Sequence, residues 1–270
     1  MDNFGESRYR VETSKFIKTP ILYCKHCDLF RRIVSNEVLT QHYYAAGYVQ
    51  LQNEKEYWAI RKNFYFYLMS IIKRYKQDVK TILDIGCSYG HFLKILQEHG
   101  YKVWGVEINK VLLEILKERE FKVYEKINDV PTQLKFDCIT LIDSFYYFDS
   151  ALDALHTLKK LLNPQALLIM RLINRNWWAK FSKNVLRRKN LDCLGDAIFS
   201  YSVKSISKIL EEANFKIKGL IFVEKGKGMS FKKEFFTYLL TYLLTYLFTY
   251  LTLKKVIFSP GIIVIAEKKN

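Results

Sequence analysis

Cysteine, glycine and proline are all scarce in this chain, and their scarcity excludes several kinds of protein. Its 270 residues include five Cys, 11 Gly and 4 Pro. Five scattered cysteines are too few for a disulfide framework, and so little glycine and proline leaves little room for long disordered linkers. The polar N-terminus has no apolar stretch behind a basic start, so no signal peptide is predicted. We therefore expect a globular cytoplasmic protein with one large domain, or one domain and a small appendage.

Positive charge, in contrast, is abundant. The chain has 43 Lys and Arg against 27 Asp and Glu, which gives a formal net charge of +16. Such an excess favours acidic partners, such as phosphorylated substrates, nucleic acid or an anionic membrane surface. A Lys-rich composition spread over solvated faces explains the same charge. Charge alone therefore selects no partner.

Strands and helices are predicted to alternate from Val79 onward, because short apolar runs are separated by segments with helical spacing of apolar residues. The predicted strands are 79–85, 102–106, 121–125, 136–142 and 166–171, and the helices between them are 91–98, 110–119 and 150–162. A helix at 202–213 and two strands at 215–223 and 261–267 follow. Alternation of this kind requires parallel strands joined by crossover helices. The predicted fold class is α/β, a Rossmann-like doubly wound, mostly parallel sheet with a C-terminal antiparallel strand.

The chain is divided into three parts by these patterns. Residues 1–48 form an N-terminal segment, 49–78 a linking helix and 79–270 the sheet-based domain. That domain contains a cap insertion at 175–200 and a hydrophobic helical insertion at 232–256. The cap interleaves Trp177 and Trp178 with cations up to Lys189, a composition suited to a phosphorylated or glycosylated substrate or a membrane interface. A solvated cap helix anchored by tryptophan is the alternative.

A glycine turn after the first strand of this domain carries the clearest chemical signal. Residues 83–90 read LDIGCSYG, and glycine in such a turn lets the backbone approach a ligand at the carboxyl end of a parallel strand. Glu107 ends the next strand, where a carboxylate can accept hydrogen bonds from two ribose hydroxyls. The dinucleotide fingerprint G-x-G-x-x-G is not met, because Ser88 and His91 replace its second and third glycines.

This stretch resembles motif I of the class I S-adenosylmethionine-dependent methyltransferases. The resemblance extends over about 79–223, through FDCITLIDS at 136–144 and LLNPQALLIMR at 161–171. It implies S-adenosylmethionine as the cofactor, bound near the amino-acid moiety by the turn and at the ribose by Glu107. The cofactor-binding residues that it implies are Asp84, Gly86, Cys87, Ser88, Gly90, Glu107, Ile108 and Asp143.

The sequence does not identify a catalytic base. Many relatives carry Glu-His where this chain has Tyr146 and Tyr147. The candidates are therefore His91, beside the cofactor loop, and these two phenols, which could position a substrate hydroxyl. A helix-start residue on the rim is the alternative for His91, and aromatic packing is the alternative for the tyrosines. Many reactions of this family need little acid–base help, because proximity and alignment supply most of the acceleration.

Two cysteines near the N-terminus resemble one knuckle of a zinc ribbon. Cys24 and Cys27 lie in the sequence CKHC between two predicted strands at 21–33. Some sugar- and cell-envelope-associated methyltransferases have two such knuckles before the methyltransferase domain. Tetrahedral zinc needs four ligands and no second C-x-x-C is present; His26 and His42 are the candidates to complete a site. We interpret the pair as a degenerate remnant and predict no metal site.

A four-residue repeat near the C-terminus begins Thr-Tyr-Leu at 237, 241, 245 and 249. Residues 235–253 contain no charge and are flanked by Lys232, Lys233, Lys254 and Lys255. The length just reaches that of a membrane span, but repeated Tyr and Thr make it a poor one. An interfacial helix suited to the basic flanks is a second interpretation, and a helix packed on its own domain or a partner is a third.

These observations together predict an S-adenosylmethionine-dependent methyltransferase that methylates an oxygen of a small or carrier-linked acceptor, such as a sugar, quinone-like or polyketide-like compound. The acceptor class follows from the resemblance. A nucleic-acid methyltransferase is one alternative, although no Asn/Asp-Pro-Pro-Tyr motif follows the fourth strand. A non-catalytic membrane-associated module that retains the cofactor fold is another. The expected location is cytoplasmic, with peripheral contact at the inner membrane face through 232–256.

Overall fold

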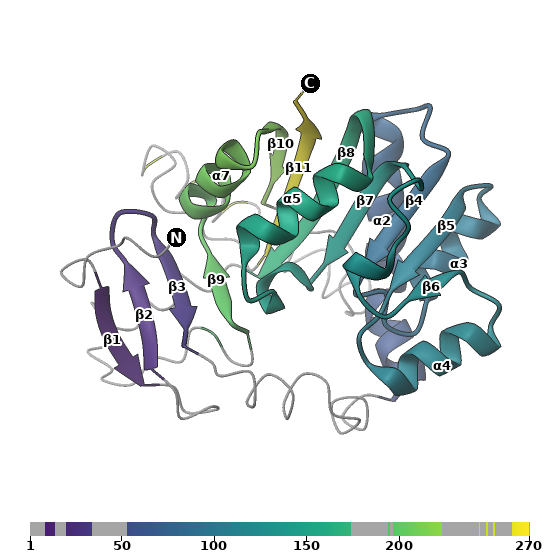
Figure 1. Ribbon diagram of the computed structural model, residues 1–270, viewed down its shortest axis with the longest axis horizontal. Helices are drawn as coiled ribbons and strands as arrows, with labels where there is room; N and C mark the ends of the chain where they lie inside the picture. The colour runs from purple at the N-terminus through teal and green to yellow at the C-terminus, as the bar shows by residue number, and fades with distance from the viewer. Residues whose placement is uncertain are drawn as a thin grey trace.

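The computed structural model describes residues 9–13, 20–33, 53–173, 194, 197–222, 243, 247, 251 and 261–269. Within these residues the chain forms a large sheet covered by helices on both faces and a smaller sheet beside it (Figure 1). The predicted cap at 175–200 lies mostly outside the described residues. The helical insertion at 232–256 is described only at residues 243, 247 and 251.

The large sheet has seven strands in the order β10-β11-β8-β7-β4-β5-β6. Their bounds are β4 Thr81–Ile85, β5 Lys102–Val106, β6 Val123–Tyr124, β7 Phe136–Ile142, β8 Leu162–Ile173, β10 Phe215–Ile221 and β11 Gly261–Lys268. Strands β4 to β8 pair in parallel, whereas β11 pairs antiparallel with both β8 and β10. The predicted fold class is therefore confirmed, and β11 is inserted between β8 and β10.

Helices cover the two faces of this sheet in separate groups. The bounds of the helices are α2 Glu54–Tyr75, α3 His91–Glu98, α4 Lys110–Glu118, η4 Ile127–Asp129, η5 Phe145–Tyr147, α5 Ala151–Leu161 and α7 Val203–Glu212. Side chains of α5 and α7 share one apolar cluster with the sheet, and those of α2 and α3 share the other. Successive strand residues alternate between the clusters because side chains on a strand point to opposite faces.

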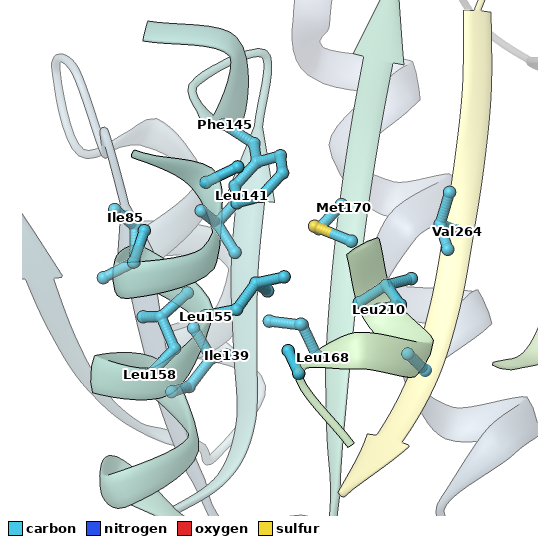
Figure 2. Close-up of a cluster of buried hydrophobic side chains, with 14 of the residues drawn as sticks. Ile85, Ile139, Leu141, Phe145, Leu155, Leu158, Leu168, Met170, Leu210 and Val264 are labelled. Atoms are coloured by element: carbon cyan, nitrogen blue, oxygen red, sulfur yellow. The ribbon is translucent and has the colours of Figure 1, made fainter. Parts of the chain in front are cut away.

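Figure 2 shows part of the α5 and α7 cluster, in which Leu155, Leu158 and Leu210 pack on side chains from the strands. On β8, Leu168 and Met170 face this cluster, whereas Ile169 belongs to the opposite one. The apolar runs of the central strands are thus buried on both faces, as expected for parallel strands. Residues at the carboxyl ends of β4, β5 and β7 belong to these two apolar clusters, and this packing holds the strand ends in place.

Strand β8 differs from its prediction. It begins at Leu162, directly after α5, rather than at residue 166. The register against β7 shifts between Phe136 and Cys138, and Gln165 in the opposing stretch has a positive φ of 55°. Pro164 therefore lies in an irregular part of the ladder, a place where strands tolerate proline.

The smaller sheet joins the N-terminal strands to a strand from much later in the chain. Its order is β1-β2-β3-β9, with β1 Tyr9–Thr13, β2 Pro20–Cys24, β3 Leu29–Arg32 and β9 Phe199–Tyr201. The two strands predicted around the cysteines are thus present as β2 and β3. Arg32, fully buried, donates from its backbone N–H to Ile198 O and from Nε to Ala197 O. The domain boundaries at residues 48 and 78 stay predictions.

Candidate functional site

The glycine turn after β4 has a geometry that only glycine allows. Gly86 has a φ of +78°, and a Cβ built on it would lie 2.7 Å from Ser144 Cβ. Ser144 in turn donates its hydroxyl to Ile85 O at 2.6 Å, which ties the turn to the end of β7. A side chain at Gly86 would therefore meet both backbone strain and a steric clash.

Glu107 connects this turn to the end of β5. Its Oε2 accepts a hydrogen bond from Ser88 N at 2.8 Å, and its Oε1 accepts one from Asn109 N at 2.9 Å. Burial raises the pKa of Glu107, while these backbone hydrogen bonds oppose the rise. A carboxylate offers about four acceptor positions, and the backbone donors, Ile108 among them, leave part of this capacity for a ligand.

Three of the predicted cofactor residues support the turn from behind. The Asp84 carboxyl is buried and accepts a hydrogen bond from Thr140 Oγ1 at 2.6 Å, and burial raises its pKa to about 7. The Cys87 thiol is buried against Gly105, where a Cβ would lie 2.6 Å from Sγ. Gly90 has a φ of +77° and begins α3. These residues shape the loop rather than line a cavity.

A pocket of about 690 Å³ opens at the carboxyl ends of β4, β5 and β7. The predicted residues that line it are Gly86, Ser88, Glu107, Ile108, Asp143, Tyr146 and Tyr147. Tyr57, Arg61, Asn109, Leu112, Ile127, Asn128 and Phe148 also line it and were not predicted. Asp84, Cys87, Gly90 and His91 are not among the lining residues. The structure thus brings most of the predicted cofactor and phenol residues to one cavity.

Asp143 lies between two arginines at the wall of this pocket. Its Oδ2 is 3.1 Å from Arg61 Nη2, and its Oδ1 pairs with Arg171 Nη1. Arg61 also stacks over the Tyr57 ring, with 4.9 Å from its guanidinium carbon to the ring centroid. Sequence reasoning missed both arginines. Arg171 could have been noticed, because it is a charged residue inside the apolar run of β8. Arg61 could not, because it is one cation among several in a basic helix.

The catalytic candidates occupy different places. His91 lies on the α2 side of the loop, with Nε2 3.3 Å from Glu54 Oε1 and its ring 4.9 Å from that of Trp58. Burial lowers the pKa of His91. Tyr146 and Tyr147 line the pocket with their ring centroids 4.6 Å apart. The geometry therefore favours the phenols over His91 as groups that face a ligand.

Asn109 provides a donor for which the described part of the protein offers no partner. Its Oδ1 caps α4 by accepting hydrogen bonds from Val111 N at 3.1 Å and Leu112 N at 3.2 Å. Its Nδ2 is buried and has no hydrogen-bond partner among the described residues. Buried polar groups are nearly always satisfied, so an unsatisfied amide in the wall of a pocket fits a ligand that supplies an acceptor.

The turn between β2 and β3 holds the cysteine pair. Cys27 N donates to Cys24 Sγ at 3.3 Å, and His26 Nε2 lies 2.8 Å from Lys208 Nζ. His42 lies outside the described residues. In the part of the chain that the structure describes, no three His, Cys, Asp or Glu side chains are grouped to hold a metal ion. The interpretation of this pair as a degenerate remnant without a metal stays a prediction.

The fold and the pocket together define an α/β nucleotide-type ligand site, built on a glycine turn and a carboxylate at the ends of adjacent parallel strands. A family model for a methyltransferase domain matches residues 57–218. The chain belongs to this family of methyltransferases. The match begins inside α2 and includes every described residue that lines the pocket.

Individual relatives agree with this family. A candidate methyltransferase of Geobacillus sp. (strain WCH70) is 30% identical over 118 residues, 40% of this chain and 46% of the relative. The ubiquinone biosynthesis O-methyltransferase of Alkalilimnicola ehrlichii is 27% identical over 109 residues, 36% of this chain and 43% of that protein. The chain thus matches less than half the length of both curated relatives.

Solved structures show the same fold. An S-adenosylmethionine-dependent methyltransferase from Clostridium acetobutylicum superposes with a TM-score of 0.53 at 12% identity, covering 87% of this chain and all of that one. The predicted methyltransferase family and the predicted fold class are confirmed. In the described part of the chain no helix is long and apolar enough to cross a membrane.

Proposed function

We propose that this protein transfers a methyl group from S-adenosylmethionine to an oxygen atom of a small or carrier-linked acceptor. The observation that carries the proposal is the placement of Glu107 in the pocket wall beside a turn that only glycine can form. The remaining acceptor capacity of its carboxylate suits a ribose hydroxyl. Ile108, Leu112 and Ile127 offer an apolar wall for the adenine ring.

Arg61 suits the other end of the cofactor. Its guanidinium lines the pocket and is held by Asp143 and the Tyr57 ring. A planar guanidinium binds a carboxylate in a paired geometry that lysine cannot reproduce, so we assign it to the methionine carboxylate. When bound, S-adenosylmethionine supplies a methyl group already activated by its sulfonium. The chain's own task is therefore to hold donor and acceptor in line and keep water out.

The oxygen acceptor is supported by two observations. The Alkalilimnicola relative is an O-methyltransferase of ubiquinone biosynthesis by name. In this chain Tyr146, Tyr147 and Phe148 form an aromatic part of the pocket wall, which suits a flat quinone-like acceptor. The two phenols can donate a hydrogen bond that positions an acceptor hydroxyl. Sugar and polyketide-like compounds are the other acceptors that fit a pocket of this size.

Peripheral membrane contact through 232–256 is part of the same proposal. Leu243, Leu247 and Leu251 are helical and expose 54%, 55% and 71% of their surface. Residues four apart lie on one side of a helix, so on the helix proposed for this segment the three leucines would form an exposed apolar stripe. The lysines at 232, 233, 254 and 255 flank this segment in the sequence, and basic flanks favour an anionic lipid surface. A lipid-linked acceptor would then be met at the membrane.

Calorimetric titration with S-adenosylmethionine and S-adenosylhomocysteine tests the cofactor assignment. We expect both to bind the wild-type protein and Glu107→Gln to weaken binding at least tenfold, because hydrogen bonds to a charged acceptor are lost. Glu114→Gln, an exposed carboxylate on α4, is the matched control and should bind as the wild type does. A well-folded wild-type protein that binds neither compound would contradict the proposal.

A further inference from the structure

Arg171 makes two separate contacts with Asp143, and both hold Asp143 in place. The residue belongs to β8, where it is the cross-strand neighbour of Ile142 at the end of β7. Its backbone O accepts a hydrogen bond from Asp143 N at 3.1 Å, and its guanidinium pairs with Asp143 Oδ1. The Arg171 side chain is only 3% exposed, so it has little room to adopt another position.

The backbone of Asp143 lies in the left-handed region, and its side-chain contacts favour this conformation. It has a φ of 58°, a left-handed conformation that is uncommon for residues other than glycine. The strand β7 ends there, and the chain turns into η5, which carries Tyr146 and Tyr147 to the pocket. A side chain clamped by two guanidinium groups offsets the cost of this conformation.

We infer that Arg171 is a positioning residue, which holds Arg61 in its ligand-binding orientation through the Asp143 carboxylate. Arg171 pairs with Oδ1 of Asp143 and leaves Oδ2 to Arg61. The Asp143 carboxylate therefore lies between two positively charged guanidinium groups, that of Arg171 on β8 and that of Arg61 at the pocket. Arg171 also keeps Asp143 from turning both oxygens toward Arg61 and neutralising it. The inference rests on the proposed function, since it assumes that Arg61 binds the methionine carboxylate.

The relay from Arg171 through Asp143 to Arg61 should affect only one end of the ligand, the end that carries the carboxylate. A neutral residue at position 171 should change the orientation of Arg61, which faces the ligand carboxylate. Glu107, which follows β5, should keep its own hydrogen-bond partners. Affinity for S-adenosylhomocysteine should fall, whereas affinity for 5′-methylthioadenosine, which has the nucleoside but no carboxylate, should not. A residue that only stabilises the fold would weaken both ligands equally.

Calorimetric titration of both ligands tests the relay in four variants. We expect Arg171→Met to weaken S-adenosylhomocysteine about tenfold or more and methylthioadenosine by less than twofold. Arg61→Gln should give the same pattern, and the double variant should lose no more than Arg61→Gln alone, because the two residues act in series. Arg171→Lys, which keeps the charge, should recover part of the affinity. If Arg171→Met fails to fold, Arg171→Gln replaces it.

Three results would overturn the relay: equal losses for both ligands, additive losses in the double variant, or no loss in any folded variant at position 171. The failure of the proposed function looks different, since the wild-type protein would then bind neither ligand. If wild-type binding is intact and only the selective pattern is missing, the cofactor assignment stands and the role of Arg171 is rejected.

Discussion

At the scale of single residues, the site contains carboxyl groups whose protonation is set by burial. Asp84 is the clearest case, because it is enclosed behind the glycine turn with Thr140 as its hydrogen-bond donor. Desolvation raises its pKa from 3.8 to about 7, and the nearby Glu107 adds to the rise. An acid with a raised pKa binds its proton more tightly in the folded protein than in the unfolded chain. Its contribution to stability is therefore present at low pH and lost as the pH rises from about 4 to about 7.

Asp84→Asn should remove this pH dependence. The amide oxygen can still accept the Thr140 hydroxyl, and no charge has to be buried. We expect the variant to gain about 1 to 3 kcal/mol of unfolding free energy over the wild type at pH 8, and much less at pH 5. Urea unfolding of both proteins at the two pH values measures the difference. A gain that is equal at both pH values would show that ionisation of Asp84 has no part in it.

Asn109 allows a test of a single hydrogen-bond donor. Asn109→Ser keeps a side-chain oxygen to cap α4, since serine and asparagine are comparable N-caps, but it removes Nδ2. We expect S-adenosylmethionine affinity to fall about five- to tenfold with little change in thermal stability. Asn109→Ala, which also removes the cap, should lower the melting temperature as well. Unchanged affinity in the serine variant would mean that Nδ2 has no ligand partner.

At the scale of elements, the turn between β4 and α3 depends on the absence of one side chain. Gly86 and Gly100 both have left-handed backbones, with φ of +78° and +86°. A Cβ on Gly86 would lie 2.7 Å from Ser144 Cβ, whereas one on Gly100 would meet nothing within 4 Å. The two positions therefore share the conformational strain and differ in the steric clash.

Gly86→Ala and Gly100→Ala form a matched pair. The left-handed backbone should cost each variant about 1 kcal/mol of stability, because alanine disfavours this conformation, and Gly86→Ala should lose more because its Cβ also clashes with Ser144. Only Gly86→Ala should displace the turn and weaken S-adenosylmethionine binding, by at least tenfold, while Gly100→Ala binds as the wild type does. Calorimetry and thermal unfolding give both quantities. Equal affinities for the two variants would show that the turn adapts to the clash.

A comparison of the helices and strands with the sequence shows which parts of the site could be predicted from the sequence. The Gly86 turn and Glu107 were predictable because turn, strand and helix signals within 25 residues specify them. Arg61 and Arg171 were not, since they meet only through Asp143 when α2, β7 and β8 come together. The insertion of β11 between β8 and β10 and the addition of β9 to the N-terminal strands are likewise long-range pairings. Local periodicity carries no information about such partners.

At the scale of the whole molecule, the proposed membrane contact rests on a net charge of +16 and on the exposed side chains of Leu243, Leu247 and Leu251. We expect the protein to sediment with vesicles that contain phosphatidylglycerol and less with pure phosphatidylcholine, with the difference reduced at high salt. Serine at Leu243, Leu247 and Leu251 together should abolish this binding and leave S-adenosylmethionine affinity unchanged.

Serine at Ile33 and Val111, which are 49% and 43% exposed elsewhere on the surface, is the matched control and should sediment as the wild type does. If the leucine variant binds vesicles as well as the wild type, membrane contact through this segment is rejected. A change of oligomeric state in the leucine variant, without vesicle binding by the wild type, would assign the stripe to a second copy of the chain instead.

The position of β11 has a consequence for how the chain folds while it is being synthesised. Strands β8 and β10 leave a gap that only residues 261–268 fill, and that strand pairs along its length with β8. During synthesis the edge of β8 therefore stays unpaired while almost a hundred further residues are added after it. Unpaired edges of apolar strands are prone to aggregate. Closure of the sheet thus depends on β11, and ribosome-bound chains that stop before residue 261 should be caught by chaperones.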